Sequence, residues 1–149
     1  MGYILALIGM GLMVGLSGAG SAIGLVIGGS SVLGMVKKKP EAFGSGMLLS
    51  ALPASQGLYG FVGFIMYQGV VNPNITLFQG AVVLGAGLAI SLACFISAIY
   101  QGKVMANGIA ALGQGHNVFG NTMILGAFPE LYAILSLVAA ILMKSLIYN

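Results

Sequence analysis

The feature that most constrains the fold of this 149-residue chain is a series of four long apolar stretches. They run over residues 3–36, 42–67, 78–107 and 118–146. Each exceeds the roughly 20 residues that a helix needs to cross the hydrocarbon core of a membrane. Only helices and closed barrels satisfy their backbone hydrogen bonds there, and the sequence has no series of short alternating strands. We therefore predict an all-α membrane protein with four transmembrane helices in two hairpins.

The charge content points to the same class. Only 5% of the residues are charged, whereas soluble domains carry roughly 25%. This excludes most soluble enzymes, and it excludes most nucleic-acid binders because Lys37, Lys38 and Lys39 hold three of the five basic residues. Such a basic knot is a topology signal. The lone Cys94 lies inside an apolar stretch and is predicted to be a small buried side chain.

The three breaks between the stretches predict the topology. By the positive-inside rule, the break at Lys37–Lys39 lies in the cytoplasm. Successive crossings then place the break around His116 on the same side, with the Asn72 turn and both termini outside. His116 is a candidate proton relay, but we favour a solvated loop residue, and we interpret Glu41 as a surface charge beside the lysines.

The two halves of the chain resemble each other. At an offset of 76 residues, the first half matches the second at three places: 11–12 with 87–88, 21–23 with 97–99, and 43–44 with 119–120. Beyond Phe119 we interpret the offset as 74, which pairs Gln56 with Glu130. The sequence therefore predicts a parallel duplication, with one hairpin over residues 1–72 and the other over 73–149.

Small residues recur at every fourth position on the first and third predicted helices. Examples are Gly20, Gly24 and Gly28 on the first, and Ala81, Gly85, Ala89, Ala93 and Ser97 on the third. Such stripes let helix backbones approach closely in lipid. The second and fourth helices carry bulkier side chains. A ring of subunits, with helices one and three on the crowded inner circle, fits this asymmetry.

Glu130 is the one acidic residue within a predicted span. An ionised carboxylate in hydrocarbon is costly, so it must be protonated, paired or coordinated to a cation. Lys103 and Lys144 lie nearer the predicted helix ends, which leaves no basic partner at depth. We therefore favour an exchangeable cation over a neutral, purely structural Glu130.

Other polar residues are predicted to reach the same depth. Gln56 lies about as far from its cytoplasmic turn as Glu130 does, roughly 25 Å of helix, and Gln101 approaches that level from the third helix. Ser55 and Tyr59 share a face of the second helix with Gln56. Oxygen ligands around a single carboxylate favour Na⁺ over a divalent ion or a bare proton. Each polar residue taken alone also fits a simple helix-joining role.

Two prolines flank this predicted site. Pro53 and Pro129 each remove a backbone donor, which frees the carbonyls of Leu49 and Leu125 most directly. The sequence does not decide which carbonyl serves as a ligand or accepts a side-chain hydrogen bond.

Three motifs carry a resemblance to a known family. Residues 52–60 (LPASQGLYG), 97–102 (SAIYQG) and 128–133 (FPELYA) resemble the proteolipid rotor-ring subunit of V-type ATPases, closest to bacterial Na⁺-translocating forms. The likeness covers essentially the whole chain. It implies these roles: Glu130 as ion-carrying glutamate, Gln101 and Gln56 as amide ligands, Ser55 as hydroxyl ligand, Leu52 as backbone-carbonyl ligand, and Tyr59 as hydrogen-bond donor to the glutamate. Ser55 departs from the threonine that is usual there.

The resemblance also implies partners and a location. The expected partners are identical subunits in a ring, a stator membrane subunit with an arginine, central-stalk subunits at the cytoplasmic loops, and lipid, in a bacterial plasma membrane. ATP hydrolysis takes place in other subunits, and the chain has no Gly-x-x-x-x-Gly-Lys motif of its own. We expect one Na⁺ per chain, with H⁺ as the alternative ion. A small proton-coupled transporter and an inert structural ring remain rival interpretations.

Overall fold

The computed structural model describes residues 1–148, which form helices and short connections. The elements are α1 (Gly2–Val36), α2 (Phe43–Ala51), α3 (Ala54–Gln68), α4 (Leu77–Gly113) and α5 (Phe119–Lys144), with 3₁₀ turns at Pro40–Ala42 and Ser145–Ile147. Within this described part of the chain, four helical segments are long and apolar enough to cross a membrane: Gly2–Val36, Pro40–Gln68, Leu77–Gly113 and Phe119–Ile147. The predicted all-α membrane fold is confirmed.

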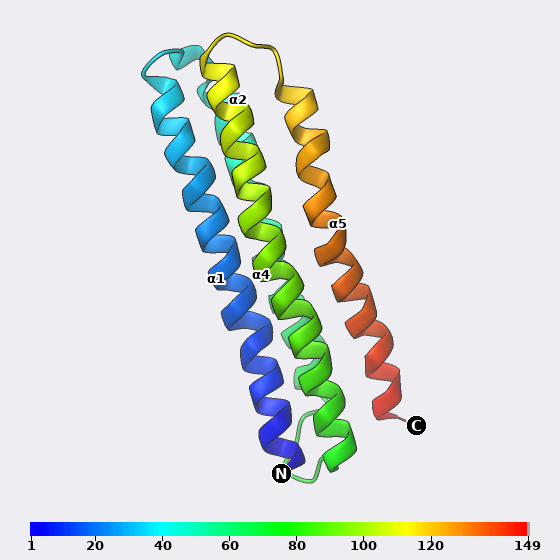
Figure 1. The fold of residues 1–149 in the computed structure, drawn as a ribbon. Coiled ribbons are helices and arrows are strands. Elements are labelled where there is room, and N and C mark those ends of the chain that lie inside the picture. Colours follow the sequence, from blue (N-terminus) through cyan, green and yellow to red (C-terminus); the bar gives the residue numbers. More distant parts are fainter. Residues whose placement is uncertain (149) are drawn as a thin grey trace.

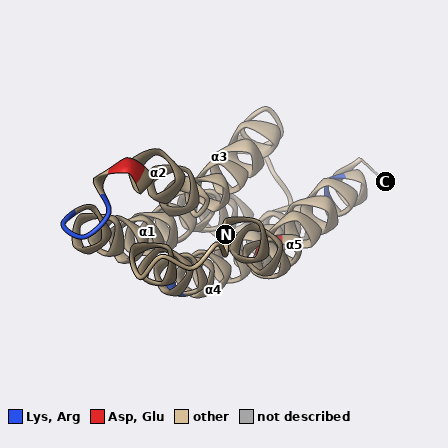
Figure 2. Ribbon diagram, turned by 90° about the horizontal axis from the view of Figure 1, so that it is seen from above, with Lys and Arg blue, Asp and Glu red and all other residues tan. Residues whose placement is uncertain are grey.

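The four segments run up and down in a bundle of two hairpins (Figure 1). Met1, the connection between α3 and α4, and the end of α5 lie at one end, and the other two connections lie at the opposite end. Charged residues gather where α1 meets α2, and most of the helical surface is uncharged (Figure 2). Glu41 and His116 are exposed, as expected of loop residues. The predicted relative sidedness fits this arrangement, while the cytoplasmic assignment stays a prediction.

α4 extends beyond the apolar stretch 78–107 at both ends and stops at the break around His116. Thr76 and Gln79 form a capping box that starts the helix at Leu77. The helix continues past residue 107 to Gly113, where Gly115 adopts a left-handed φ of 93°. The amides of Gly115 and His116 donate to the carbonyls of Leu112 and Ala111 at 3.0 and 3.1 Å. This is the Schellman pattern that ends helices.

The length of α4 defines the depth of Lys103. This residue lies ten positions before Gly113, or about 15 Å along the helix axis, so it is two residues nearer the helix end than Gln101. Its side chain is exposed, and its Nζ lies 4.8 Å from the centroid of the Tyr100 ring. A cation over an aromatic face is a favourable arrangement.

Small residues bring α1 and α4 into backbone contact. A Cβ atom on Gly9 would lie 2.6 Å from the Val83 carbonyl oxygen, and one on Gly102 would lie 2.5 Å from that of Gly24. Such distances leave no room for a side chain, so the helices approach through their glycines. The predicted close packing of these two helices is confirmed, and we call this contact the α1–α4 seam.

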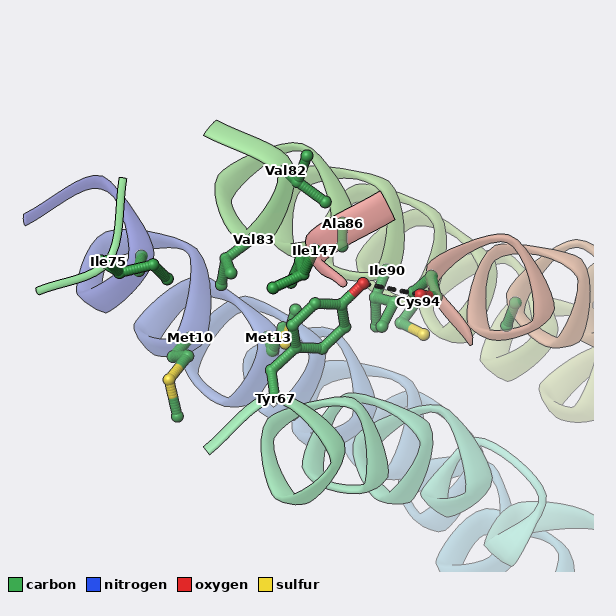
Figure 3. Close-up of a cluster of buried hydrophobic side chains, with 13 residues drawn as sticks. Met10, Met13, Tyr67, Ile75, Val82, Val83, Ala86, Ile90, Cys94 and Ile147 are labelled. Atoms are coloured by element: carbon green, nitrogen blue, oxygen red, sulfur yellow. Dashed lines mark hydrogen bonds between the residues drawn. The ribbon is translucent and has the colours of Figure 1, made fainter. Parts of the chain in front are cut away.

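A buried cluster holds together the end of the bundle that contains Met1 (Figure 3). Tyr67 of α3 lies inside it beside Met13 and Ile90, and its hydroxyl donates to the Ala140 carbonyl of α5 at 2.7 Å. Cys94 belongs to the same cluster and is fully buried, as predicted. The tyrosine therefore joins the second and fourth spans at this end.

The two prolines act differently on their helices. At Pro53 the second span is interrupted: α2 ends at Ala51 and α3 starts at Ala54. The amide of Ser55 donates to the Leu52 carbonyl at 3.2 Å, which tightens the chain locally. Pro129 instead lies inside an unbroken α5. Each proline nevertheless removes one backbone hydrogen bond, and both prolines lie at the depth of the polar residues.

Candidate ion-binding site

Glu130 lies where α3, α4 and α5 meet, and it is partly buried. The Tyr59 hydroxyl of α3 donates to its Oε1 at 2.8 Å. The Gln101 Nε2 of α4 donates to its Oε2 at 3.1 Å. Both oxygens of Glu130 therefore have hydrogen-bond partners, and because a tyrosine hydroxyl can donate or accept, the pair with Tyr59 fits both the ionised and the protonated carboxyl group.

Two fully buried glutamines form the centre of the site. Gln56 Nε2 donates to Gln101 Oε1 at 2.9 Å, and Gln101 Nε2 donates to the Gly126 carbonyl at 2.8 Å in addition to Glu130. These contacts fix both ends of the Gln101 amide. Its Oε1 keeps a second lone pair for a further partner.

Ser55 and the Leu52 carbonyl lie beside the other amide oxygen. The Ser55 hydroxyl is 3.0 Å from the Leu52 carbonyl oxygen and 3.2 Å from Gln56 Oε1, within donating distance of each. The break at Pro53 supplies this position, because it exposes the end of α2. Every residue that the sequence predicted for the site thus lies in one connected cluster, which we call the polar junction.

The carbonyls that accept side-chain donors are not those of Leu49 and Leu125, which the positions of the prolines indicated. Gln101 and Ser97 donate instead to the carbonyls of Gly126 and Pro129. The reason is geometric, since these carbonyls lie within reach of the α4 side chains. A missing backbone donor loosens the turn. The side chains of the neighbouring helix then determine which backbone carbonyl oxygen accepts a hydrogen bond.

Ser97 is a member of the polar junction that was not predicted from the sequence. It is 6% exposed, it accepts a hydrogen bond from Gln56 Nε2 at 3.2 Å, and it donates to the Pro129 carbonyl at 2.6 Å. In the sequence it looks like one more small residue of a packing stripe. Its place four residues before Gln101, on the same helix face, was the signal that could have found it.

The chemistry of the polar junction suits a singly charged ion. It offers one carboxylate and several neutral oxygens, and over residues 1–148 there is no group of three His, Cys, Asp or Glu side chains that could hold a metal ion. A divalent ion would keep uncompensated charge in the membrane. The arrangement can hold a monovalent cation or a proton.

Comparison with known proteins agrees with the fold. The sequence model of the ATP synthase C-subunit family matches residues 8–67 and again residues 84–143. The chain therefore belongs to the ATP synthase C-subunit family, with two copies of the family's domain, and the resemblance seen in the sequence is confirmed.

Three individual relatives show which proteins of this family the chain resembles. The chain is 41% identical over 140 residues to the A-type ATP synthase subunit K of Methanocaldococcus jannaschii, covering 94% of this chain and 61% of that protein. It is 36% identical over 116 residues to the V-type sodium ATPase subunit K of Enterococcus hirae, covering 77% and 74%. The human V-type proton ATPase 16 kDa proteolipid is 22% identical over 117 residues, covering 78% and 76%.

The two family matches bear on the internal register. They start and end 76 residues apart, as do Pro53 and Pro129. An uninterrupted offset of 76 would pair Ala54 with Glu130, whereas the predicted offset of 74 pairs Gln56 with it. In either register the first half has no acid at this position, so the prediction of one carboxylate per chain does not depend on the choice.

Proposed function

We propose that this chain is the ion-carrying rotor subunit of the membrane sector of a V/A-type ATPase. Identical copies form a ring, and Glu130 of each copy carries one Na⁺ across the membrane as the ring turns. Membership of the ATP synthase C-subunit family supports the rotor role. The observation that carries the sodium assignment is a carboxylate with a hydrogen-bond partner on each oxygen. It lies beside neutral oxygen atoms that can coordinate a cation.

Five residues supply the proposed ligands. Glu130 gives the charge, and the side-chain oxygens of Gln101, Gln56 and Ser55 and the carbonyl of Leu52 complete the set. The Tyr59 hydroxyl donates to the carboxylate at 2.8 Å and orients it. A bound Na⁺ neutralises Glu130, and this lowers the cost of exposing the site to lipid during rotation.

The remaining steps need partners. An arginine of a stator membrane subunit displaces Na⁺ from Glu130 into an exit path, and central-stalk subunits at the cytoplasmic loops turn the ring. Moving one charge against 100 mV costs about 2.3 kcal/mol. ATP hydrolysis in other subunits supplies this energy, since the chain itself has no nucleotide-binding motif.

Proton transport by the same rotor is the second candidate, and the similarity to a V-type proton ATPase proteolipid is the observation that favours it. A protonated Glu130 would donate one hydrogen bond, and the Tyr59 hydroxyl at 2.8 Å is able to accept it. We favour Na⁺ because several neutral oxygen ligands lie around the single carboxylate.

The test is carbodiimide modification of the purified ring at constant pH and ionic strength. A carbodiimide reacts with the protonated acid, so we expect labelling of Glu130 and a lower labelling rate as Na⁺ replaces K⁺. Failure of Na⁺ to protect at any pH would contradict the sodium assignment and leave the proton version. Labelling that bypasses Glu130 would contradict both versions.

The mass of the detergent-extracted particle separates the rotor from a small four-helix transporter. The rotor account predicts a stable large ring of identical chains. A monomer or dimer that transports ions on its own would contradict it.

A further inference from the structure

The hydrogen bonds of the polar junction have a defined direction. Ser97 lies between an amide and a backbone carbonyl: its hydroxyl donates to the Pro129 carbonyl at 2.6 Å and accepts from Gln56 Nε2 at 3.2 Å. A backbone carbonyl can only accept, so the one hydroxyl proton of Ser97 is committed to Pro129. Ser97 therefore offers only lone pairs to Gln56.

This commitment determines which end of the Gln56 amide faces Ser97. The amide presents an acceptor oxygen at one end and a donor nitrogen at the other. With Nε2 turned toward Ser97, Oε1 faces the Ser55 hydroxyl at 3.2 Å. Ser55 cannot fix this orientation itself, because a hydroxyl can either donate or accept.

Gln101 gives Gln56 a second anchor, but that anchor is shared with the ion. Gln101 Oε1 accepts from Gln56 Nε2 at 2.9 Å, and the same oxygen is one of the proposed Na⁺ ligands. When a cation coordinates Gln101 Oε1, Gln56 Nε2 still has Ser97 as a hydrogen-bond partner. Ser97 is not one of the proposed cation ligands. Ser97 is nearly fully buried, with 6% of its surface exposed.

We propose that Ser97 is a positioning residue for cation selectivity. It holds the Gln56 amide with its oxygen toward the ion and its nitrogen away, and it ties this amide to the turn of α5 that carries Glu130. This inference rests on the proposed function, because it assumes that Gln56 Oε1 is a cation ligand. Without Ser97, a flipped Gln56 directs a donor nitrogen toward the cation, which favours H⁺ over Na⁺.

The experiment measures the Na⁺ concentration that halves the rate of carbodiimide labelling of Glu130. We expect Ser97→Ala to raise this concentration about tenfold, the size of one lost buried hydrogen bond. The labelling rate without Na⁺ should change by less than about twofold, since Tyr59 and Gln101 still hold the carboxylate. Added to a Gln56→Ala variant, Ser97→Ala should have no further effect on Na⁺, because it acts through Gln56.

Ser97→Thr is the matched control, since it keeps the hydroxyl. Ser97 borders a mostly apolar groove of about 340 Å³ beside Tyr100 and Pro129, and this groove has room for the added methyl group. We expect the threonine variant to respond to Na⁺ like the wild type. Should the alanine variant not assemble, Ser97→Cys keeps a weaker donor and should give an intermediate Na⁺ response.

The outcomes separate this inference from the function on which it rests. A wild type without Na⁺ protection overturns the sodium carrier itself. A protected wild type with an equally protected Ser97→Ala variant overturns only the role of Ser97. An alanine effect of the same size in the Gln56→Ala background also overturns it, since Ser97 would then act by a route other than Gln56.

Discussion

Adjacent residues of α4 serve two regions of opposite character. Ala98 and Gly102 face α1 in the seam, where a Cβ on Gly102 would lie 2.7 Å from the Gly24 Cα. Ser97 and Gln101, each one position earlier, enter the polar junction and hydrogen-bond to α3 and α5. At this level α4 thus presents small residues to α1 and amide and hydroxyl groups to the polar junction.

The difference separates the residues that hold the helices together from those of the proposed ion site. The seam is built from backbone contacts between small residues, so it keeps α1 and α4 at a fixed separation. The polar junction is built from side-chain hydrogen bonds, in which one partner can replace another. Changes in the seam should therefore affect folding and assembly, and changes in the junction should affect the ion.

The largest effect is expected at Glu130. Glu130→Gln keeps the size of the side chain, removes its charge and replaces one acceptor oxygen by a donor nitrogen. Ion transport by the assembled complex should fall to background, while the ring keeps its wild-type mass. The measurements are Na⁺ uptake into vesicles and native mass of the ring. Transport at wild-type rates would show that Glu130 is not the carrier.

The seam is tested by Gly102→Ala, which places a methyl group against the backbone of Gly24. Overpacking typically costs about 1–3 kcal/mol, and we expect the upper end because backbone cannot move aside. Thermal unfolding of the detergent-solubilised ring should show a lower Tm or little recovered ring. Gly120→Ala is the control, since its Cβ meets nothing within 4 Å in the chain. Equal Tm values for the two variants would contradict the seam.

The same contrast divides two tyrosines of α3. Tyr67 donates to a backbone carbonyl in the buried cluster, at 2.7 Å from Ala140. Tyr67→Phe should lower the free energy of unfolding by about 1 kcal/mol, the usual value of one hydrogen bond. The Na⁺ concentration that protects Glu130 should stay the same. A changed Na⁺ response with unchanged Tm would reverse the assignment of this residue.

Tyr59→Phe is the matched variant and has the smallest expected effect on stability. Its hydroxyl contacts the Glu130 carboxylate, so its loss should change the protective Na⁺ concentration by about tenfold or more, since a hydrogen bond to a charged group contributes about 1.5–3 kcal/mol. The Tm should change less than in Tyr67→Phe. The two readouts, measured on both variants, test whether the boundary between structural and ion-handling residues lies between Tyr59 and Tyr67.

Much of this fold could be predicted from the sequence because lipid leaves few options. Long apolar stretches must be helices there, and stripes of glycine must be close contacts. The convergence of Gln56, Gln101 and Glu130 followed from equal depth along neighbouring helices. The apolar stretch stops at residue 107, but α4 continues to the break that the sequence indicates around His116, where Gly115 carries the left-handed φ that closes the helix.

Other features depend on contacts between helices, which a single sequence does not specify. A serine in a stripe of small residues looks the same whether it packs or donates, so Ser97 was missed. Pro53 and Pro129 each lack a backbone N–H donor, yet only Pro53 interrupts its helix. Which carbonyl each proline makes available depends on the helix opposite, as the Ser97 contact with Pro129 shows.

The central claim is that Glu130 of each chain holds one Na⁺. Equilibrium binding of radioactive ²²Na⁺ to the purified ring, divided by the number of chains, tests it most directly. The account predicts one Na⁺ per chain in the wild type and none in Glu130→Gln at the same Na⁺ concentration. Two Na⁺ per chain, or undiminished binding in the Glu130→Gln ring, would contradict it.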